Sequence, residues 1–127
     1  MLEIHEIPDI SKYNLILEGL PPDKSKLRVV EAFGRAKMVT GFAVFSYEED
    51  CVNIYRCEYG DDIDLCDGIL RSILFKASMK GIDTGKCMAQ ADGENLFTKM
   101  HYTKGNETMI QSIASLMNGC KRCKEMI

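Results

Sequence analysis

The hydrophobic pattern of the chain changes its period close to Gly60, and this change constrains the fold more than any other feature. Before it, residues 27–59 contain three apolar segments rich in β-branched and aromatic side chains, separated by short polar turns. After it, apolar side chains recur three or four residues apart through residues 65–77, as they do on one face of a helix. We therefore expect an antiparallel meander followed by a long helix, which is an α+β architecture.

The middle segment of the meander is apolar at successive positions, which predicts a central strand covered on both faces. A short strand and a short helix are expected before the meander, because a weakly alternating segment and a few spaced apolar residues precede it. The expected bounds are residues 2–7 for the first strand, 10–20 for the short helix, and 27–33, 38–47 and 51–59 for the meander.

Acidic residues crowd the start of the long helix, where the helix dipole favours negative charge. Gly81 is placed to end this helix, because glycine tolerates the left-handed conformation common just beyond a helix. A strand at residues 86–91 and a short helix at residues 94–100 are expected next. A last helix at residues 109–117 would end at Gly119, and an edge strand at residues 107–111 is the competing interpretation.

Length and composition are those of one globular domain, residues 1–127, with a short Cys-containing tail at about residues 118–127. Apolar residues make up 46% of the chain and charged residues 28%, and the net charge of −3 argues against a nucleic-acid partner. No apolar run approaches the roughly 20 residues of a membrane span. We also expect no signal peptide, because residues 1–6 include acids and lack an apolar core. We expect a cytoplasmic protein with reduced thiols and with a small molecule or another protein as partner; a homodimer stays open.

The order of meander, long helix, strand and short helix is similar to that of the GNAT (N-acetyltransferase) superfamily. The run from Ile69 to Gly81, which ends in Ala-x-x-x-Gly, resembles the long helix of that family. The run from Leu96 to Tyr102 resembles the family's Leu-Tyr-x-Lys-Leu-Gly-Phe segment. Over roughly residues 27–102 the resemblance implies a GNAT-like (acyl-CoA N-acyltransferase) fold and an acyl-CoA-dependent N-acetyltransferase.

The resemblance also implies a site at the end of the third meander strand. In the family, the loop after this strand binds the pyrophosphate of acetyl-CoA at the N-terminus of the long helix. By position alone, Tyr59, Gly60 and Cys66 would then bind the cofactor. Glu58, near the end of the strand, would be the general base.

Two departures from the family pattern count against the way in which the family usually binds and uses acetyl-CoA. Residues 61–66 read Asp-Asp-Ile-Asp-Leu-Cys, where the family has Arg/Gln-x-x-Gly-x-Gly/Ala. Without the glycines a phosphate cannot approach the backbone closely, and Asp61, Asp62 and Asp64 repel it, so they disfavour acetyl-CoA. Phe97 stands where the family often has a tyrosine that protonates the leaving thiolate, and phenylalanine has no proton to donate.

These departures leave alternatives to an enzyme open. The chain is also interpreted as a non-catalytic GNAT-fold module that binds a small ligand or a protein. The acids then cap a helix, and Glu58 is a solvated strand residue. Strict alternation places Tyr55 and Tyr59 on one strand face with Asn53, where they would line the family's cleft or belong to the core.

The tail carries a Cys-x-x-Cys motif at Cys120 and Cys123, a spacing that lets two thiolates bind one metal ion or lets one thiol resolve a disulfide. Zinc or an iron–sulfur cluster would need further ligands, since such sites use four. A thiol or metal protein that acts through this tail is therefore a third hypothesis, and an incidental polar chain end is its simpler interpretation.

We predict that a thiol reagent modifies the two tail cysteines first, because the neighbouring basic residues favour the reactive thiolate. Mass spectrometry of the partially alkylated native protein measures this order. First labelling of a strand cysteine such as Cys57 would contradict the prediction and would call for a metal analysis of the tail. The cysteines expected to react later are Cys51, Cys57, Cys66 and Cys87.

Overall fold

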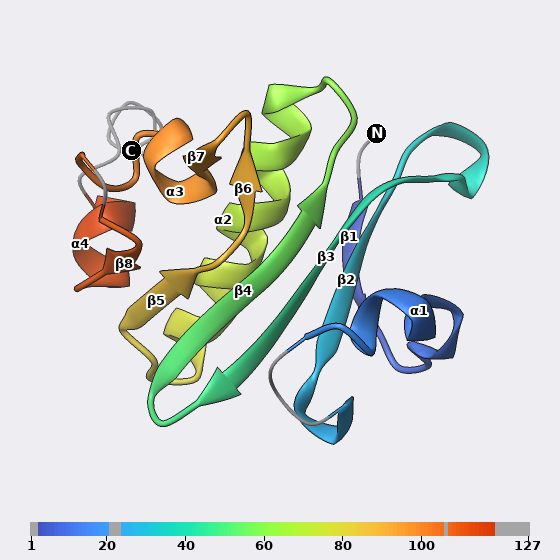
Figure 1. Cartoon of the computed structure of the whole chain (residues 1–127), viewed down its shortest axis with the longest axis horizontal. Coiled ribbons are helices and arrows are strands. Elements are labelled where there is room, and N and C mark those ends of the chain that lie inside the picture. Colours follow the sequence, from blue (N-terminus) through green and yellow to red (C-terminus); the bar gives the residue numbers. More distant parts are fainter. Residues whose placement is uncertain (1–2, 21–23, 106, 119–127) are drawn as a thin grey trace.

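A six-stranded mixed sheet organises the chain in the computed structural model, which describes residues 3–20, 24–105 and 107–118 (Figure 1). In their order across the sheet, the strands are β1 (Glu3–Ile7), β2 (Arg28–Phe33), β3 (Val39–Glu48), β4 (Cys51–Glu58), β5 (Thr84–Cys87) and β8 (Met109–Ile110). Neighbouring strands are antiparallel except β4 and β5, which are parallel. Two further strands, β6 (Gln90–Ala91) and β7 (Glu94–Asn95), pair with each other in a small hairpin.

Helices cover both faces of this sheet. The long helix α2 (Ile63–Met79) packs on one face, and the short helix α1 (Asn14–Leu17) with its preceding 3-10 turn η1 (Ser11–Tyr13) packs on the other. The remaining helical elements are the 3-10 turns η2 (Lys24–Lys26) and η3 (Arg35–Lys37) and the helices α3 (Leu96–Lys99) and α4 (Ile113–Asn118). In the described part of the chain, no helix has both the length and the apolar character of a membrane span.

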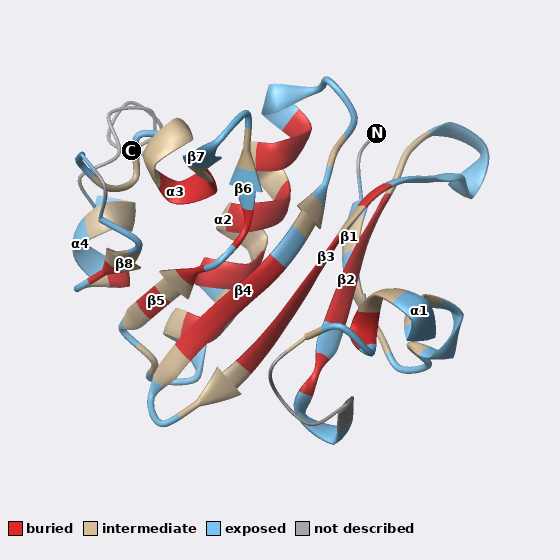
Figure 2. Ribbon diagram, in the orientation of Figure 1, coloured by how far each residue is buried: buried red, intermediate tan, exposed pale blue. Residues whose placement is uncertain are grey.

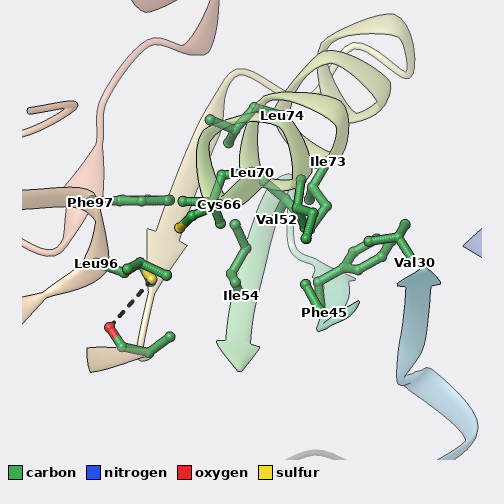
Figure 3. Packing of buried hydrophobic residues seen from close by; sticks show 14 of the residues in the cluster. Val30, Phe45, Val52, Ile54, Cys66, Leu70, Ile73, Leu74, Leu96 and Phe97 are labelled. Carbon is green, nitrogen blue, oxygen red and sulfur yellow. Dashed lines mark hydrogen bonds between the residues drawn. The ribbon is translucent and has the colours of Figure 1, made fainter. Parts of the chain in front are cut away.

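The main core lies between α2 and the sheet, and buried residues follow the inner face of the helix and the middle of the strands (Figure 2). Figure 3 shows the side chains of Leu70, Ile73 and Cys66 reaching from α2 toward Val52 and Ile54 of β4. Complete burial of a side chain such as Ile73 stabilises the fold by about 1.5–3 kcal/mol relative to an exposed one.

A glycine lets α2 approach the sheet closely. A Cβ atom at Gly41 of β3 would lie 2.7 Å from the Glu58 carbonyl oxygen and 3.1 Å from Cδ1 of Ile69. Real Cβ atoms do not approach a backbone oxygen that closely, so any side chain here would push β3 away from β4 or from the helix. The absence of a side chain at Gly41 therefore allows α2 to pack closely against the sheet beside the end of β4.

A second core lies on the opposite face, under the N-terminal segment. The buried carboxylate of Glu31 on β2 accepts a hydrogen bond of 2.5 Å from the Tyr13 hydroxyl and lies 2.6 Å from the Lys12 ammonium. The Tyr13 ring packs against Phe42 of β3, with ring centroids 4.5 Å apart. This ion pair, in which only the carboxylate is buried, and the aromatic contact hold η1 on the sheet. The fully packed apolar residues of this core are Leu17, Leu27, Val29, Val44 and Tyr55.

The structure confirms the predicted meander and long helix. All three predicted strands are present and consecutive, and no helix lies between residues 38 and 59, all of which are described. The prediction of a central strand covered on both faces is also confirmed, because β3 contributes Phe45 to the α2 core and Val44 to the second core.

The structure corrects the predictions after the long helix. The expected strand at residues 86–91 begins earlier, at Thr84, and pairs with β4 only as far as Cys87. Both interpretations of residues 107–117 hold in part, since the strand β8 is followed by the helix α4. The predicted short helix at residues 10–20 is limited to η1 and α1. Gly119, the predicted helix end, and the cysteines of the tail lie outside the described residues.

A distant aspartate explains where α4 begins. The carboxylate of Asp83 accepts hydrogen bonds of 2.8 Å from the Ser112 hydroxyl and from the Ala114 amide. Its backbone carbonyl accepts a third bond of 2.7 Å from the Ile113 amide. These contacts bind the first amides of α4, and the Ser112 hydroxyl, directly before the helix, accepts a further bond of 3.2 Å from the Ser115 amide.

Candidate functional site

Strands β4 and β5 separate partway along their length. Their pairing runs from Cys51 opposite Thr84 to Ile54 opposite Cys87, and the Met88 amide then donates a last bond of 2.8 Å to the Ile54 carbonyl. β4 continues past this point (Figure 1). Among the described strands, its residues 56–58 pair with β3 alone. The opposite backbone edge of β4 is therefore open where a neighbouring strand would otherwise lie.

A β-bulge reorients β4 at the same level. Val44 pairs with Arg56 and Phe45 with Ile54, so β4 contains one extra residue, Tyr55. Such a bulge strengthens the local twist and shifts the alternation of side chains between the two faces. Beyond it, Cys57 packs toward the α2 core, whereas Arg56 faces away from it.

Because of the bulge, the prediction that Tyr55 and Tyr59 lie on the same face of the strand is wrong. Tyr55 belongs to the second core, and its hydroxyl lies 2.8 Å from that of Ser46. Tyr59 instead packs against the α2 core. The two tyrosines therefore lie on opposite faces, and of the two only Tyr59 reaches the space between the end of β4 and the β6–β7 hairpin.

A cleft of about 520 Å³ occupies that space. The structure places three of the predicted site residues together in it, namely Glu58, Tyr59 and Gly60. The fourth, Cys66, is fully buried in the core and does not line the cleft. One wall consists of Cys57, Glu58, Tyr59, Gly60, Asp61 and Ile63, and the other of Gln90, Ala91, Asp92 and Lys99.

The charges around the cleft are mostly paired and mostly negative. The Lys99 ammonium lies 2.7 Å from the Asp92 carboxylate; this pairing lowers the pKa of Asp92 and raises that of Lys99. The Glu58 carboxylate lies 2.8 Å from the Arg56 guanidinium. The lining residues thus carry three carboxylates, the third being Asp61, and one ammonium. The sequence does not indicate Lys99 or Asp92 as cleft residues, because the β6–β7 hairpin and α3 bring them opposite the end of β4.

The N-terminus of α2 is capped by the chain itself. Asp62 is the N-cap, and its carboxylate accepts a hydrogen bond of 3.1 Å from the Leu65 amide. Asp64 adds a further acid in the first turn. The Leu65 amide, one of the helix N-terminal amides that could bind a phosphate, is therefore already hydrogen-bonded to the Asp62 carboxylate. Two more acids, Asp61 and Asp64, lie on either side of Asp62 in the sequence.

Two thiols meet behind the wall formed by β4. Cys57 lines the cleft, and Cys66 lies behind it in the first turn of α2. A hydrogen bond between them raises the pKa of Cys57 and lowers that of Cys66; burial opposes the lowering. Burial also raises the pKa of the Tyr59 phenol, and the nearby Cys66 adds to this effect.

Phe97 takes no part in the cleft. Its ring is fully buried, with its centroid 5.9 Å from that of Tyr102, and it lines neither cleft wall. Within the described residues, no three His, Cys, Asp or Glu side chains are arranged to hold a metal ion. Cys120 and Cys123, predicted as metal ligands, lie outside those residues, so their role stays a prediction.

We predict that Asp62→Ala lowers the free energy of unfolding by about 1 kcal/mol, because it removes the capping acceptor of α2. Asp62→Asn keeps an acceptor oxygen and should lower the free energy of unfolding by less. The matched control Asp61→Ala removes the same charge outside the cap and should change stability by less than about 0.5 kcal/mol. Urea unfolding measures all three, and equal losses for Asp61→Ala and Asp62→Ala would contradict the capping role.

No protein-family model and no curated protein sequence matches the chain. Solved structures do match. The PaiA N-acetyltransferase of Thermoplasma acidophilum, solved in complex with coenzyme A, is 11% identical with a TM-score of 0.59, over 86% of this chain and 96% of that one. The ribosomal-protein-S18-alanine N-acetyltransferase of Escherichia coli is 12% identical with a TM-score of 0.58, over 80% and 74% of the two chains.

A GNAT-family acetyltransferase of Staphylococcus aureus is 8% identical with a TM-score of 0.55, over 86% of this chain and 96% of that one. At such identities the likeness concerns the fold. It agrees with the elements described above, which are an antiparallel meander, a long helix and a parallel strand that separates from β4. The chain has the fold of the GNAT acyltransferases.

Proposed function

We propose that the protein is an acyl-CoA-dependent N-acyltransferase whose cleft holds the acyl-pantetheine arm, while the N-terminus of α2 contributes little to binding the diphosphate. The observation that carries this proposal is the open edge of β4 along the cleft. The fold supports it as well, because a protein of the same fold was solved with coenzyme A.

An open strand edge presents backbone N–H and C=O groups that an extended chain can pair with. The pantetheine arm is such a chain, because it is linear and contains two amide groups. The cleft beside Cys57 and Tyr59 runs along this edge and gives the arm a place to lie. A strand-like pairing of the arm with β4 is therefore the binding mode we propose.

The diphosphate end of the cofactor meets a different environment. Asp62 already occupies the cap of α2, and Asp61 and Asp64 add negative charge around it. Two like charges about 4 Å apart repel by roughly 1 kcal/mol in water and by more where solvent is partly excluded. We therefore expect coenzyme A to gain little affinity from its nucleotide half.

Glu58 and Tyr59 are the residues we propose for the chemistry. Glu58 is the last residue of β4 and Tyr59 follows it directly, and both line the same cleft. The amine nitrogen would attack the thioester carbonyl, and Glu58 would accept a proton from that nitrogen as the C–S bond breaks. Tyr59, whose raised pKa keeps it protonated, would donate its proton to the departing thiolate. It would thereby fill the role that Phe97 cannot.

The binding proposal predicts that acetyl-pantetheine and acetyl-CoA bind with affinities within about tenfold of each other, which is ~1.4 kcal/mol. Both should bind more weakly than the low micromolar range. The double variant Asp61→Asn/Asp64→Asn should improve acetyl-CoA binding on the order of fivefold by removing repulsion, and should leave acetyl-pantetheine unchanged. Isothermal titration at low salt, where charge effects are least screened, measures these constants.

The matched control is Glu49→Gln/Asp50→Asn, which removes two charges at the other end of β4. It should change neither affinity. Low micromolar binding of acetyl-CoA by the unaltered protein would contradict the account of the α2 N-terminus. A failure of acetyl-pantetheine to bind would contradict the account of the cleft.

The catalytic proposal predicts that Glu58→Gln lowers kcat about a hundredfold or more and leaves the affinity for acetyl-pantetheine unchanged. The assay follows thiol release from acetyl-CoA in the presence of primary amines, namely spermidine, lysine and peptides with free N-termini. Glu49→Gln is the matched control. If the unaltered protein binds acetyl-pantetheine but transfers acetyl to none of these amines, the non-catalytic binding module is the better description.

A further inference from the structure

Two cysteines that no acyl-transfer step requires meet where one wall of the cleft joins the core. Cys57 lies on β4 just past the bulge and lines the cleft. Cys66 lies directly behind it, in the first turn of α2, and has no exposed surface. Both pack into the same core, where a hydrogen bond joins the two thiols. Cys57 is therefore reached from the cleft, whereas Cys66 lies on the core side of the pair.

We propose that Cys57 and Cys66 form a redox-active dithiol, which a hydroperoxide oxidises to an intramolecular disulfide. The proposal does not depend on acyl transfer, because it needs only the two thiols and access through the cleft. Exposed thiols with a partner sulfur in contact are the usual setting of reversible cysteine oxidation.

The other described cysteines lack this arrangement. The Cys87 thiol is buried and donates to the Ala89 carbonyl at 3.7 Å. Cys51 lies at the opposite end of β4, beside the carbonyl of Val52 at 3.7 Å. Neither lines the cleft.

Access from the cleft, rather than charge, directs the oxidant to Cys57, because Cys57 lines the cleft and Cys66 does not. The hydrogen bond between the two thiols lowers the pKa of Cys66, and the Lys99 ammonium adds to this lowering. The Cys57 sulfur attacks one oxygen of the hydroperoxide, the O–O bond breaks, and the other oxygen leaves as an alcohol or water with the Cys57 proton. The Cys57 sulfenic acid keeps the oxygen that was attacked. Cys66 attacks that sulfur, the S–S bond forms, and water leaves, so the two sulfurs together supply the two electrons that reduce the peroxide.

The disulfide would join the end of β4 to the first turn of α2. These two segments form one wall of the cleft, so the bond would fix their spacing and remove the Cys57 thiol from the lining. A ligand in the cleft should in turn shield Cys57 from the oxidant. This last link rests on the proposed function, whereas formation of the disulfide does not.

Tryptic digestion separates the relevant sulfurs. Cys57 and Cys66 lie together in the peptide of residues 57–71, whereas Cys51 lies in residues 38–56 and Cys87 in residues 87–99. The experiment uses the full chain with Cys120→Ser and Cys123→Ser, so that the tail cannot react. The protein is treated with hydrogen peroxide, denatured, alkylated and digested without reductant. We expect peptide 57–71 to lose two hydrogens and to resist alkylation, and dithiothreitol to restore both alkylation sites.

Three variants make the test decisive. Cys57→Ser and Cys66→Ala should each abolish the linked peptide, whereas Cys51→Ser should leave it intact. If peptide 57–71 keeps two alkylatable thiols after oxidation, or if Cys57 links to Cys87, the proposal is wrong. Oxidation that acetyl-pantetheine fails to slow would leave the dithiol standing and would count against ligand binding in the cleft.

Discussion

The end of pairing between β4 and β5 after Ile54 is the constraint on which the candidate site depends. The extra residue in β4, Tyr55, twists the strand, while the chain beyond Cys87 leaves it to form the β6–β7 hairpin. These two departures open the cleft and expose one edge of β4 along it. The same bulge sends Cys57 and Tyr59 toward α2 and Arg56 away from it. The chemistry available in the cleft therefore follows from one irregularity in the sheet.

An opened sheet loses backbone hydrogen bonds, and the two cores offset this loss. On one face α2 packs against β3 and β4, close to Gly41, where a side chain would collide with the Glu58 carbonyl. On the other face the buried Glu31 holds the N-terminal segment through Lys12 and Tyr13. The part of β4 that lacks β5 is held by α2 on one face and by its pairing with β3 along one edge, which keeps the cleft wall in place although Arg56 and Glu58 on the other face are exposed. Local order of this kind is what a preorganised binding site requires.

The sequence predicted the regular parts of this structure because hydrophobic period is a local signal. It located the meander, the long helix and three of the residues that line the cleft, Glu58, Tyr59 and Gly60. It missed features that depend on pairing between distant segments. A bulge is set by the register of two strands, so alternation alone put Tyr55 and Tyr59 on one face. The pairing of Lys99 with Asp92 and the contact of Cys57 with Cys66 likewise need the hairpin and α2 in their final positions.

We propose above all that β4 binds the pantetheine arm of the cofactor, whereas the backbone amides at the N-terminus of α2 do not bind its diphosphate. A crystal structure of the protein with coenzyme A tests both halves at once. We expect the pantetheine amides to bond to the backbone of β4 between Arg56 and Tyr59. We expect Asp62 to keep its bond to the Leu65 amide, with the diphosphate outside the helix N-terminus. A diphosphate bound by the amides of the first turn of α2, with the Asp62 carboxylate displaced, would contradict the account.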